Sequence, residues 1–130
     1  NQAVDIREYV NFSEEELQAA GINEKIFINT KGQISEGTVC NVFFVRKNMI
    51  YTPQLSCGLL PGILREYIME RFQVTETIIY PDELMYYEEC FVTNSLMGVM
   101  PVRQLGNICF PHRVKADEVR EVYEKEKMSL

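Results

Sequence analysis

The chain has 130 residues, 46% hydrophobic and 25% charged, and its 13 basic and 19 acidic residues give a net charge of −6. This length and composition allow a substantial buried core, so we expect one domain over residues 1–130. An acidic surface without a basic cluster repels nucleic acid and anionic membranes, which excludes both as expected partners. There is no apolar run long enough to span a bilayer, and the polar start is not a targeting peptide.

The four cysteines are scattered and form no CxxC pair, so we predict no metal site. Reduced, mostly buried thiols are typical of a cytoplasmic protein, which is where we place this one. We expect a surface or capping role for His112, the single histidine. The chain does not begin with methionine, which indicates a piece of a longer protein.

Strands dominate the elements predicted for the first half of the chain, after an opening segment without a clear pattern. A short helix is expected over NFSEEELQAAG, because a capping box begins it and a glycine ends it. KIFIN is a predicted strand. The run QISEGTVCNVFFVRKNMIYTP contains two strand-like segments, which Lys47 and Asn48 are expected to join as a hairpin.

The second half alternates helices and strands. A helix from Gly62 is followed by the strand VTETIIY, the short helix PDELMYY and the buried strand ECFVTN. A further strand covers GVMPVRQLG, and the charged helix KADEVREVYEKEKM ends the chain with Val119, Val122 and Tyr123 on one side. These elements predict an α/β fold with a strongly curved, mainly antiparallel sheet and flanking helices.

The stretch LLPGILREYIMERF begins a helix with proline and glycine. Its apolar residues share one predicted face and its charged residues the other, with Ile63, Leu64, Tyr67, Ile68 and Phe72 opposite Arg65, Glu66, Glu70 and Arg71. Without bulky side chains in the first turn, the backbone N–H groups are open to an anion such as phosphate. A simple Pro-Gly turn is the alternative.

Two further positions carry polar groups beside predicted strands. Glu36 precedes a run that should be buried, where its carboxylate faces either solvent or a cationic nitrogen. Thr93, Asn94 and Ser95 follow a buried strand, where they form either a turn or part of a ligand site. A carboxylate, a helix end and hydroxyls together would suit a phosphorylated pyridine cofactor.

Four stretches in order resemble the C-terminal half of the class IV aminotransferases, the fold-type IV pyridoxal-phosphate enzymes. They are SEGTVCNVFFV, YTP, LLPGILR and TNSLMGVMPV, and the resemblance extends from residue 22 to about residue 106. It implies the C-terminal, cofactor-binding domain of the D-amino-acid aminotransferase-like fold, with a half-barrel-like sheet. It also implies pyridoxal 5′-phosphate as the cofactor.

The resemblance assigns roles to individual positions. Glu36 resembles the glutamate that pairs with the pyridinium nitrogen, and Leu60 resembles the residue that packs against the ring. Gly62, Ile63 and Leu64 resemble the helix start whose backbone amides bind the phosphate.

The turn after the last predicted buried strand completes this set of positions. Ser95 matches the hydroxyl ligand of the phosphate, and Asn94, Leu96 and Met97 are expected on the substrate side. The family often has threonine at the position of Leu64, so a side-chain contact with the phosphate is lost here.

Within the family, TNSLMGVMPV most resembles the turn of the 4-amino-4-deoxychorismate lyases, which release pyruvate and leave p-aminobenzoate for folate biosynthesis. Branched-chain and D-amino-acid aminotransferases are the alternative, because they share the cofactor and the first proton abstraction. A non-catalytic module that binds a ligand or a partner chain is the other class considered.

The family needs a lysine that forms a Schiff base with the cofactor, and family spacing places it upstream of Asn1. We interpret the lysines in this chain as solvated surface groups, among them Lys25, Lys31, Lys47 and Lys115. The family's N-terminal domain, which completes the active site, is absent from this sequence. We therefore expect the chain to be inactive alone, and we expect the full-length enzyme to be a homodimer.

Overall fold

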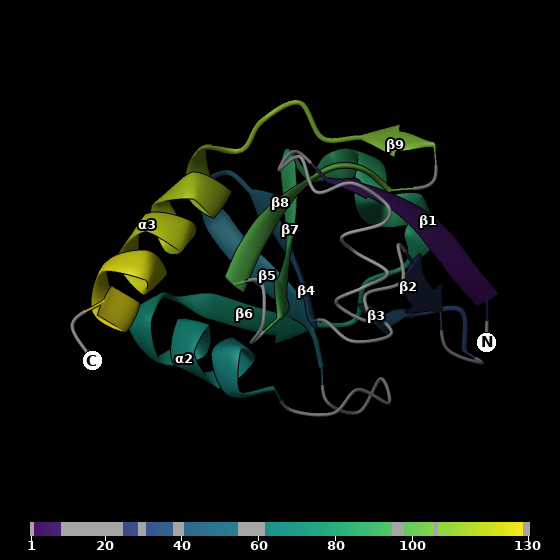
Figure 1. Ribbon diagram of the computed structural model, residues 1–130. Coiled ribbons are helices and arrows are strands. Elements are labelled where there is room, and N and C mark those ends of the chain that lie inside the picture. Colours follow the sequence, from purple (N-terminus) through teal and green to yellow (C-terminus); the bar gives the residue numbers. More distant parts are fainter. Residues whose placement is uncertain are drawn as a thin grey trace.

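The computed structural model describes residues 2–8, 25–28, 31–37, 41–54, 62–94, 98–105 and 107–128 (Figure 1). In chain order, the elements are β1 (Gln2–Glu8), β2 (Lys25–Ile28), β3 (Ile34–Gly37), β4 (Asn41–Arg46), β5 (Met49–Pro53), α2 (Ile63–Arg71), β6 (Val74–Thr77), the 3₁₀ helix η2 (Pro81–Tyr86), β7 (Glu89–Asn94), β8 (Gly98–Leu105), β9 (Ile108–Cys109) and α3 (Val114–Met128).

The strands form one sheet in the order β3-β2-β1-β8-β7-β4-β5-β6, with β9 paired to β8. The pairs are antiparallel except for β5 and β6, which run parallel because α2 connects them. The sheet is curved, and α2 and α3 lie on the same side of its central strands (Figure 1). The predicted α/β fold with a mainly antiparallel, curved sheet is confirmed.

The opening segment, for which the sequence predicted no element, is the strand β1. It pairs with β2 on one side and with β8 on the other, so partners distant in the sequence stabilise it. The local pattern QAVDIRE alternates too weakly to show this. The helix expected over NFSEEELQAAG lies outside the described residues.

The predicted hairpin at Lys47 and Asn48 is confirmed. Both residues have positive φ, 51° and 64°, and they connect β4 to β5, whose ends pair as Arg46 and Met49. Two central residues with positive φ are typical of the type I′ turn, whose twist matches that of the flanking strands. The turn therefore fixes the register between β4 and β5.

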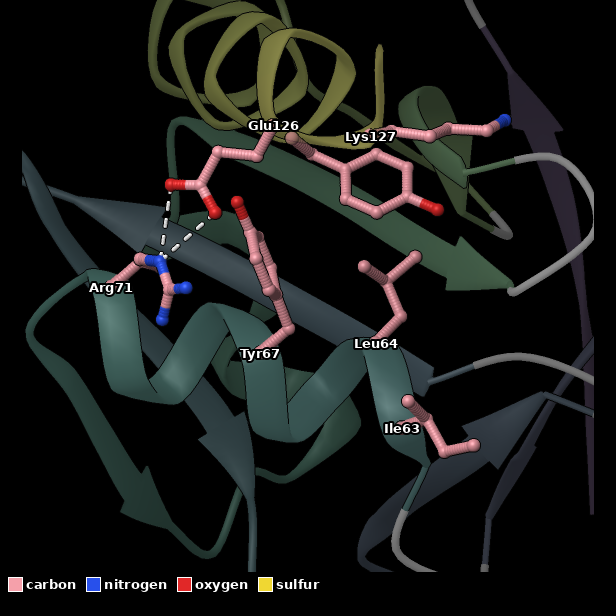
Figure 2. A pocket seen from close by; sticks show the side chains of 7 residues that line it. Ile63, Leu64, Tyr67, Arg71, Glu126 and Lys127 are labelled. Atoms are coloured by element: carbon pink, nitrogen blue, oxygen red, sulfur yellow. Dashed lines mark hydrogen bonds and ion pairs between the residues drawn. The ribbon is translucent and has the colours of Figure 1, made fainter. Parts of the chain in front are cut away.

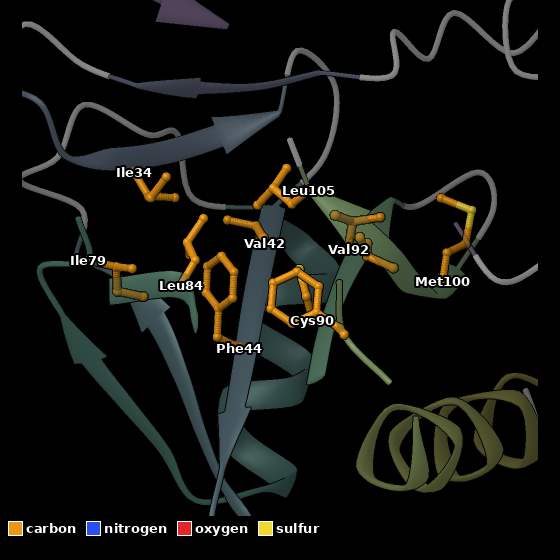
Figure 3. Packing of buried hydrophobic residues seen from close by; sticks show 11 residues of the cluster. Ile34, Val42, Phe44, Ile79, Leu84, Cys90, Val92, Met100 and Leu105 are labelled. Carbon is orange, nitrogen blue, oxygen red and sulfur yellow. The ribbon is translucent and has the colours of Figure 1, made fainter. Parts of the chain in front are cut away.

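The central strands β4 and β7 have a hydrophobic cluster on each face. One cluster packs under β3 and η2 (Figure 3), and its buried members are Ile34, Val42, Phe44, Ile79, Leu84, Cys90, Val92, Met100, Val102, Leu105 and Phe110. The other lies under the helices, where the rings of Phe43 and Phe91 stack with centroids 4.9 Å apart. Successive residues of a strand point to opposite faces, so each strand supplies both clusters.

The predicted faces of α2 are correct in the middle of the helix and wrong in its first turn. Leu64 and Ile68 are buried as expected, but Ile63 is 85% exposed and Arg65 only 3% exposed. Arg65 tolerates burial because its guanidinium donates to the carbonyl of Pro53 at 3.2 Å and pairs with a carboxylate of β6. A periodic pattern alone could not reveal these partners.

The remaining predicted elements have the expected type. VTETIIY is strand only over β6, the short helix after it is the 3₁₀ helix η2, and Val119 of α3 is buried. His112 is exposed, as expected. Of the cysteines in the described ranges, Cys90 is buried and Cys109 exposed, and neither forms a disulfide. Among the described residues, no helix has the length and apolar character needed to cross a membrane.

Candidate functional site

The N-terminus of α2 offers backbone donors to an approaching group. Gly62 is the N-cap, with φ −96° and ψ 149°, and as a glycine it supplies no side-chain cap of its own to this helix end. The first helical bond runs from the N–H of Glu66 to the carbonyl of Gly62 at 3.0 Å, so the preceding N–H groups have no carbonyl within the helix. These groups and the positive end of the helix dipole attract an anion.

Gly62 is required here because of its neighbour on β4. A Cβ atom at this position would overlap the side-chain oxygen of Asn41, which lies against the glycine backbone. Asn41 is itself buried. The helix end can therefore approach the start of β4 only without a side chain, and this close approach fixes where the backbone donors of α2 lie.

Thr93 lies directly opposite Asn41 in the pairing of β7 with β4. Directly opposite residues point to the same face of a sheet, so Thr93 faces the side on which α2 begins. Its side chain is 2% exposed, and its hydroxyl has no hydrogen-bond partner among the described residues. A buried hydroxyl without a partner costs free energy, which marks this position as unusual.

Arg65 ties the first turn of α2 to the ends of two strands. One guanidinium nitrogen lies 3.2 Å from the carbonyl of Pro53 on β5 and 3.2 Å from a carboxylate oxygen of Glu76 on β6. The Nε of Arg65 is buried and has no partner within the described ranges. Because the Glu76 carboxylate offsets its charge, Arg65 holds the first turn of α2 against the two strands without adding net charge there.

A groove of about 350 Å³ runs between α2 and α3 (Figure 2), starting at Ile63 and Leu64. At the far end of the groove, Arg71 donates two hydrogen bonds to the Glu126 carboxylate, at 3.1 and 3.2 Å. The Tyr67 hydroxyl lies beside the same carboxylate. Burial and Glu126 raise the pKa of Tyr67, while Tyr67 and Arg71 lower the pKa of Glu126. These contacts couple the two helices.

The structure describes three parts of the predicted site. Gly62, Ile63 and Leu64 form the helix end, and Asn94 ends β7, where its backbone pairs with Gly98. Glu36 lies in β3, one residue before the end of that strand.

The other predicted site residues, Leu60, Ser95, Leu96 and Met97, lie outside the described residues. Among the described residues, no cluster of histidine, cysteine or acidic side chains could hold a metal ion.

Sequence reasoning did not single out two residues of this region and assigned no specific contact to a third. Asn41 and Arg65 were not assigned to the site, and Thr93 was expected in either a turn or a ligand site. Each is a buried polar residue next to a predicted motif, but that burial was not visible in the linear pattern. The available signal was position, because Asn41 and Arg65 lie inside the stretches SEGTVCNVFFV and LLPGILR.

Residues 10–105 match the family model for amino-transferase class IV. The chain belongs to this family. The predicted resemblance is therefore confirmed, and the family is one that depends on pyridoxal phosphate.

Relatives with both of the considered activities match the chain. Branched-chain-amino-acid aminotransferase 6 of Arabidopsis thaliana is 36% identical over 94 residues, which cover 67% of this chain and 26% of that protein. The aminodeoxychorismate lyase of Bacillus subtilis is 32% identical over 90 residues, covering 65% of this chain and 31% of that protein. The chain thus spans about a third or less of these relatives.

A solved structure supports the fold. The crystal structure of a Legionella pneumophila protein assigned as a 4-amino-4-deoxychorismate lyase has a TM-score of 0.72 and 29% identity, over 78% of this chain and 40% of that one. The match supports the fold-type IV architecture at the level of backbone geometry. It does not separate lyase from aminotransferase, because structures of both are similar to this chain.

The residues present fit the phosphate of the family's cofactor. The helix end carries N–H donors without a side-chain cap, the glycine leaves its backbone accessible, and a buried hydroxyl faces the same side. N–H donors and the positive end of the helix dipole at one point suit a phosphate ester rather than a neutral group.

Proposed function

We propose that this chain is the cofactor-binding domain of a pyridoxal-phosphate enzyme, and that its enzyme is a 4-amino-4-deoxychorismate lyase. The observation that carries the cofactor proposal is the meeting of the Gly62 helix end with Asn41 and Thr93 at one end of the sheet. Three of the four family stretches contribute a residue to this meeting point. A glycine N-cap leaves the N–H groups of this helix end open to a ligand.

The residues of the chain divide the binding work. The backbone N–H groups of the first α2 turn hold the phosphate, and the family resemblance adds the Ser95 hydroxyl as a donor. The same resemblance gives Glu36 the task of keeping a proton on the ring nitrogen and Leu60 that of packing on the ring. When bound, the protonated cofactor ring supplies an electron sink.

The lyase proposal rests on the turn TNSLMGVMPV and on the similarity to the Bacillus subtilis lyase. Branched-chain aminotransferase is the second candidate, favoured by the 36% identity with the Arabidopsis thaliana enzyme. Product analysis separates them in a chain extended upstream through the expected lysine. Release of pyruvate and p-aminobenzoate supports the lyase, whereas amino transfer from a branched-chain amino acid to a 2-oxo acid supports the aminotransferase.

The test of the cofactor proposal is titration of this chain with pyridoxal 5′-phosphate, followed by absorbance. We expect binding that weakens in Ser95→Ala and Glu36→Gln, because each change removes one contact. Borohydride treatment should link the cofactor to none of the lysines of this chain, since the reactive lysine is expected upstream. A borohydride-stable adduct abolished by one Lys→Ala change in this chain would contradict this expectation.

A further inference from the structure

Thr93 lies on the helix-facing side of the sheet, one residue before the end of the central strand β7. Phe91, two residues earlier in β7, points to the same side and stacks on Phe43 beneath the helices. The partner of Thr93 across the β4 ladder is Asn41, whose side chain touches the backbone of Gly62. Among the described residues, the Thr93 side chain is therefore a polar group that lies across one strand pair from the residue touching the N-cap of α2.

A second buried threonine provides a comparison, because its hydroxyl forms a hydrogen bond within the protein. Thr52 of β5 is 1% exposed, and its hydroxyl donates to the carbonyl of Val42 at 2.8 Å. Thr93 is buried to the same degree, yet its hydroxyl has no partner within the described part of the chain. Burial without a hydrogen bond is costly, so a buried hydroxyl without a partner in the protein points to a partner from outside it.

We propose that the Thr93 hydroxyl is a further ligand-binding group, which donates a hydrogen bond to a phosphate-ester oxygen seated at the N-terminus of α2. This inference rests on the proposed function and adds a residue to which the family resemblance gave only a turn-shaping role. The hydroxyl approaches the phosphate from the strand side, while the α2 amides approach it from the helix side. A phosphate between them would satisfy both sets of donors.

The experiment uses Thr93→Val, which keeps the shape and removes the hydroxyl, with Thr93→Ser as the conservative variant. The matched control is Thr52→Val, which removes the satisfied hydroxyl. Urea midpoints are measured without ligand, and affinities are measured for pyridoxal 5′-phosphate, inorganic phosphate and pyridoxal. The pyridoxal arm separates the phosphate from the ring, because pyridoxal lacks the phosphate.

The two valine variants are expected to behave in opposite ways. Thr52→Val lowers the urea midpoint and leaves affinity unchanged, because it breaks a bond within the protein. Thr93→Val keeps or raises the midpoint, but binds pyridoxal 5′-phosphate and inorganic phosphate about tenfold more weakly, the effect expected for one hydrogen bond to a charged group. Thr93→Ser binds as the unchanged chain does, and pyridoxal affinity is the same in all variants.

Three outcomes would overturn the proposal for Thr93, and they differ in whether the cofactor proposal survives. A urea midpoint lowered by Thr93→Val would mean that the hydroxyl bonds to the protein, whether or not a ligand binds. Undiminished phosphate affinity in Thr93→Val would remove Thr93 from the site and leave the proposed function intact. If the unchanged chain bound neither phosphate compound, the cofactor proposal for this chain and the role of Thr93 would fail together.

Discussion

The helices α2 and α3 pack on the same face of the sheet but begin in opposite ways. The first turn of α3 is closed by a carboxylate from the sheet, since the N–H groups of Lys115 and Ala116 each donate to Glu89 at 3.0 Å. Glu89 belongs to β7 and is 4% exposed. The first turn of α2 has Gly62 as its N-cap and no side-chain cap.

The contrast concerns the N-terminus of a helix, which can be capped by the protein itself or can bind an external anion. Every helix N-terminus carries N–H groups without carbonyl partners and a partial positive charge. At α3 an internal anion satisfies both permanently, which makes that end structural. At α2 the N-cap is a glycine without a side chain, and the proposed phosphate site assigns the same requirement to an external anion. Strand β7 contributes a residue near the N-terminus of each helix: Glu89 at the start of the strand for α3, and Thr93 near the end of the strand for α2.

The largest expected effect comes from breaking the closed helix end. Glu89→Ala leaves the buried N–H group of Ala116 and the partly buried N–H group of Lys115 without their charged acceptor. It should lower the free energy of unfolding by about 2–4 kcal/mol. Glu89→Gln keeps one oxygen acceptor and should cost about half as much. Urea unfolding followed by circular dichroism measures both variants.

The neighbouring residue provides a matched control for this prediction. Glu88 is exposed, and its carboxylate accepts only a long hydrogen bond of 3.4 Å from the N–H of Lys47 among the contacts described. Glu88→Ala should change the free energy of unfolding by less than about 0.5 kcal/mol, as is usual for surface positions. Equal destabilisation by Glu88→Ala and Glu89→Ala would show that the α3 end needs no internal anion.

A smaller effect is expected from filling the open helix end. Gly62→Ala places a Cβ atom where the Asn41 oxygen lies, and overpacking of this kind costs about 1–3 kcal/mol. The same change should weaken binding of pyridoxal 5′-phosphate, because the helix end must move away from β4. Stability and affinity are both read from one set of samples.

A double variant isolates the steric cause. In Gly62→Ala with Asn41→Ala, the space for the new methyl group is restored, so the two changes should cost less together than the sum of their separate costs. Additive costs would mean that the glycine acts through backbone freedom rather than through contact with Asn41. That result would weaken the comparison between the two helix ends, because Gly62 would then be an ordinary turn residue.

The sequence predicted the elements well where local chemistry determines them. The hairpin at Lys47 and Asn48, the helix from Gly62 and the strand ending at Asn94 were all foreseen, because turn residues and periodicity act over a few positions. β1 was missed, because its pairing with β2 and β8 depends on residues far along the chain. The buried state of Arg65 was missed for the same reason.

The sequence motifs of the site could be predicted, but the spatial contacts between their residues could not. The family resemblance named the Gly62 helix end, whereas contacts between distant strands revealed Asn41 and Thr93 as its neighbours. No linear pattern reports that a hydroxyl is buried without a partner. The capping of α3 by Glu89 was equally hidden, because 26 positions separate this carboxylate from Lys115.

The smallest expected effect concerns the other ends of the same helices, where Arg71 of α2 pairs with Glu126 of α3. Glu126→Gln should reduce stability only slightly at pH 7, because both side chains are exposed. The pKa of Glu126 is lowered in the folded protein by Tyr67 and Arg71. Its contribution is therefore present above the unfolded value of about 4.3 and is lost as the pH falls through the lower folded value.

Urea midpoints of the unchanged chain and Glu126→Gln, measured from pH 7 down to pH 3, should consequently differ at pH 7 and draw closer as the pH falls below about 4.3. Glu121→Gln is the control, because Glu121 pairs with Lys125 within α3 and does not reach α2. A midpoint difference that persists at pH 3 would mean that Glu126 acts through packing rather than charge.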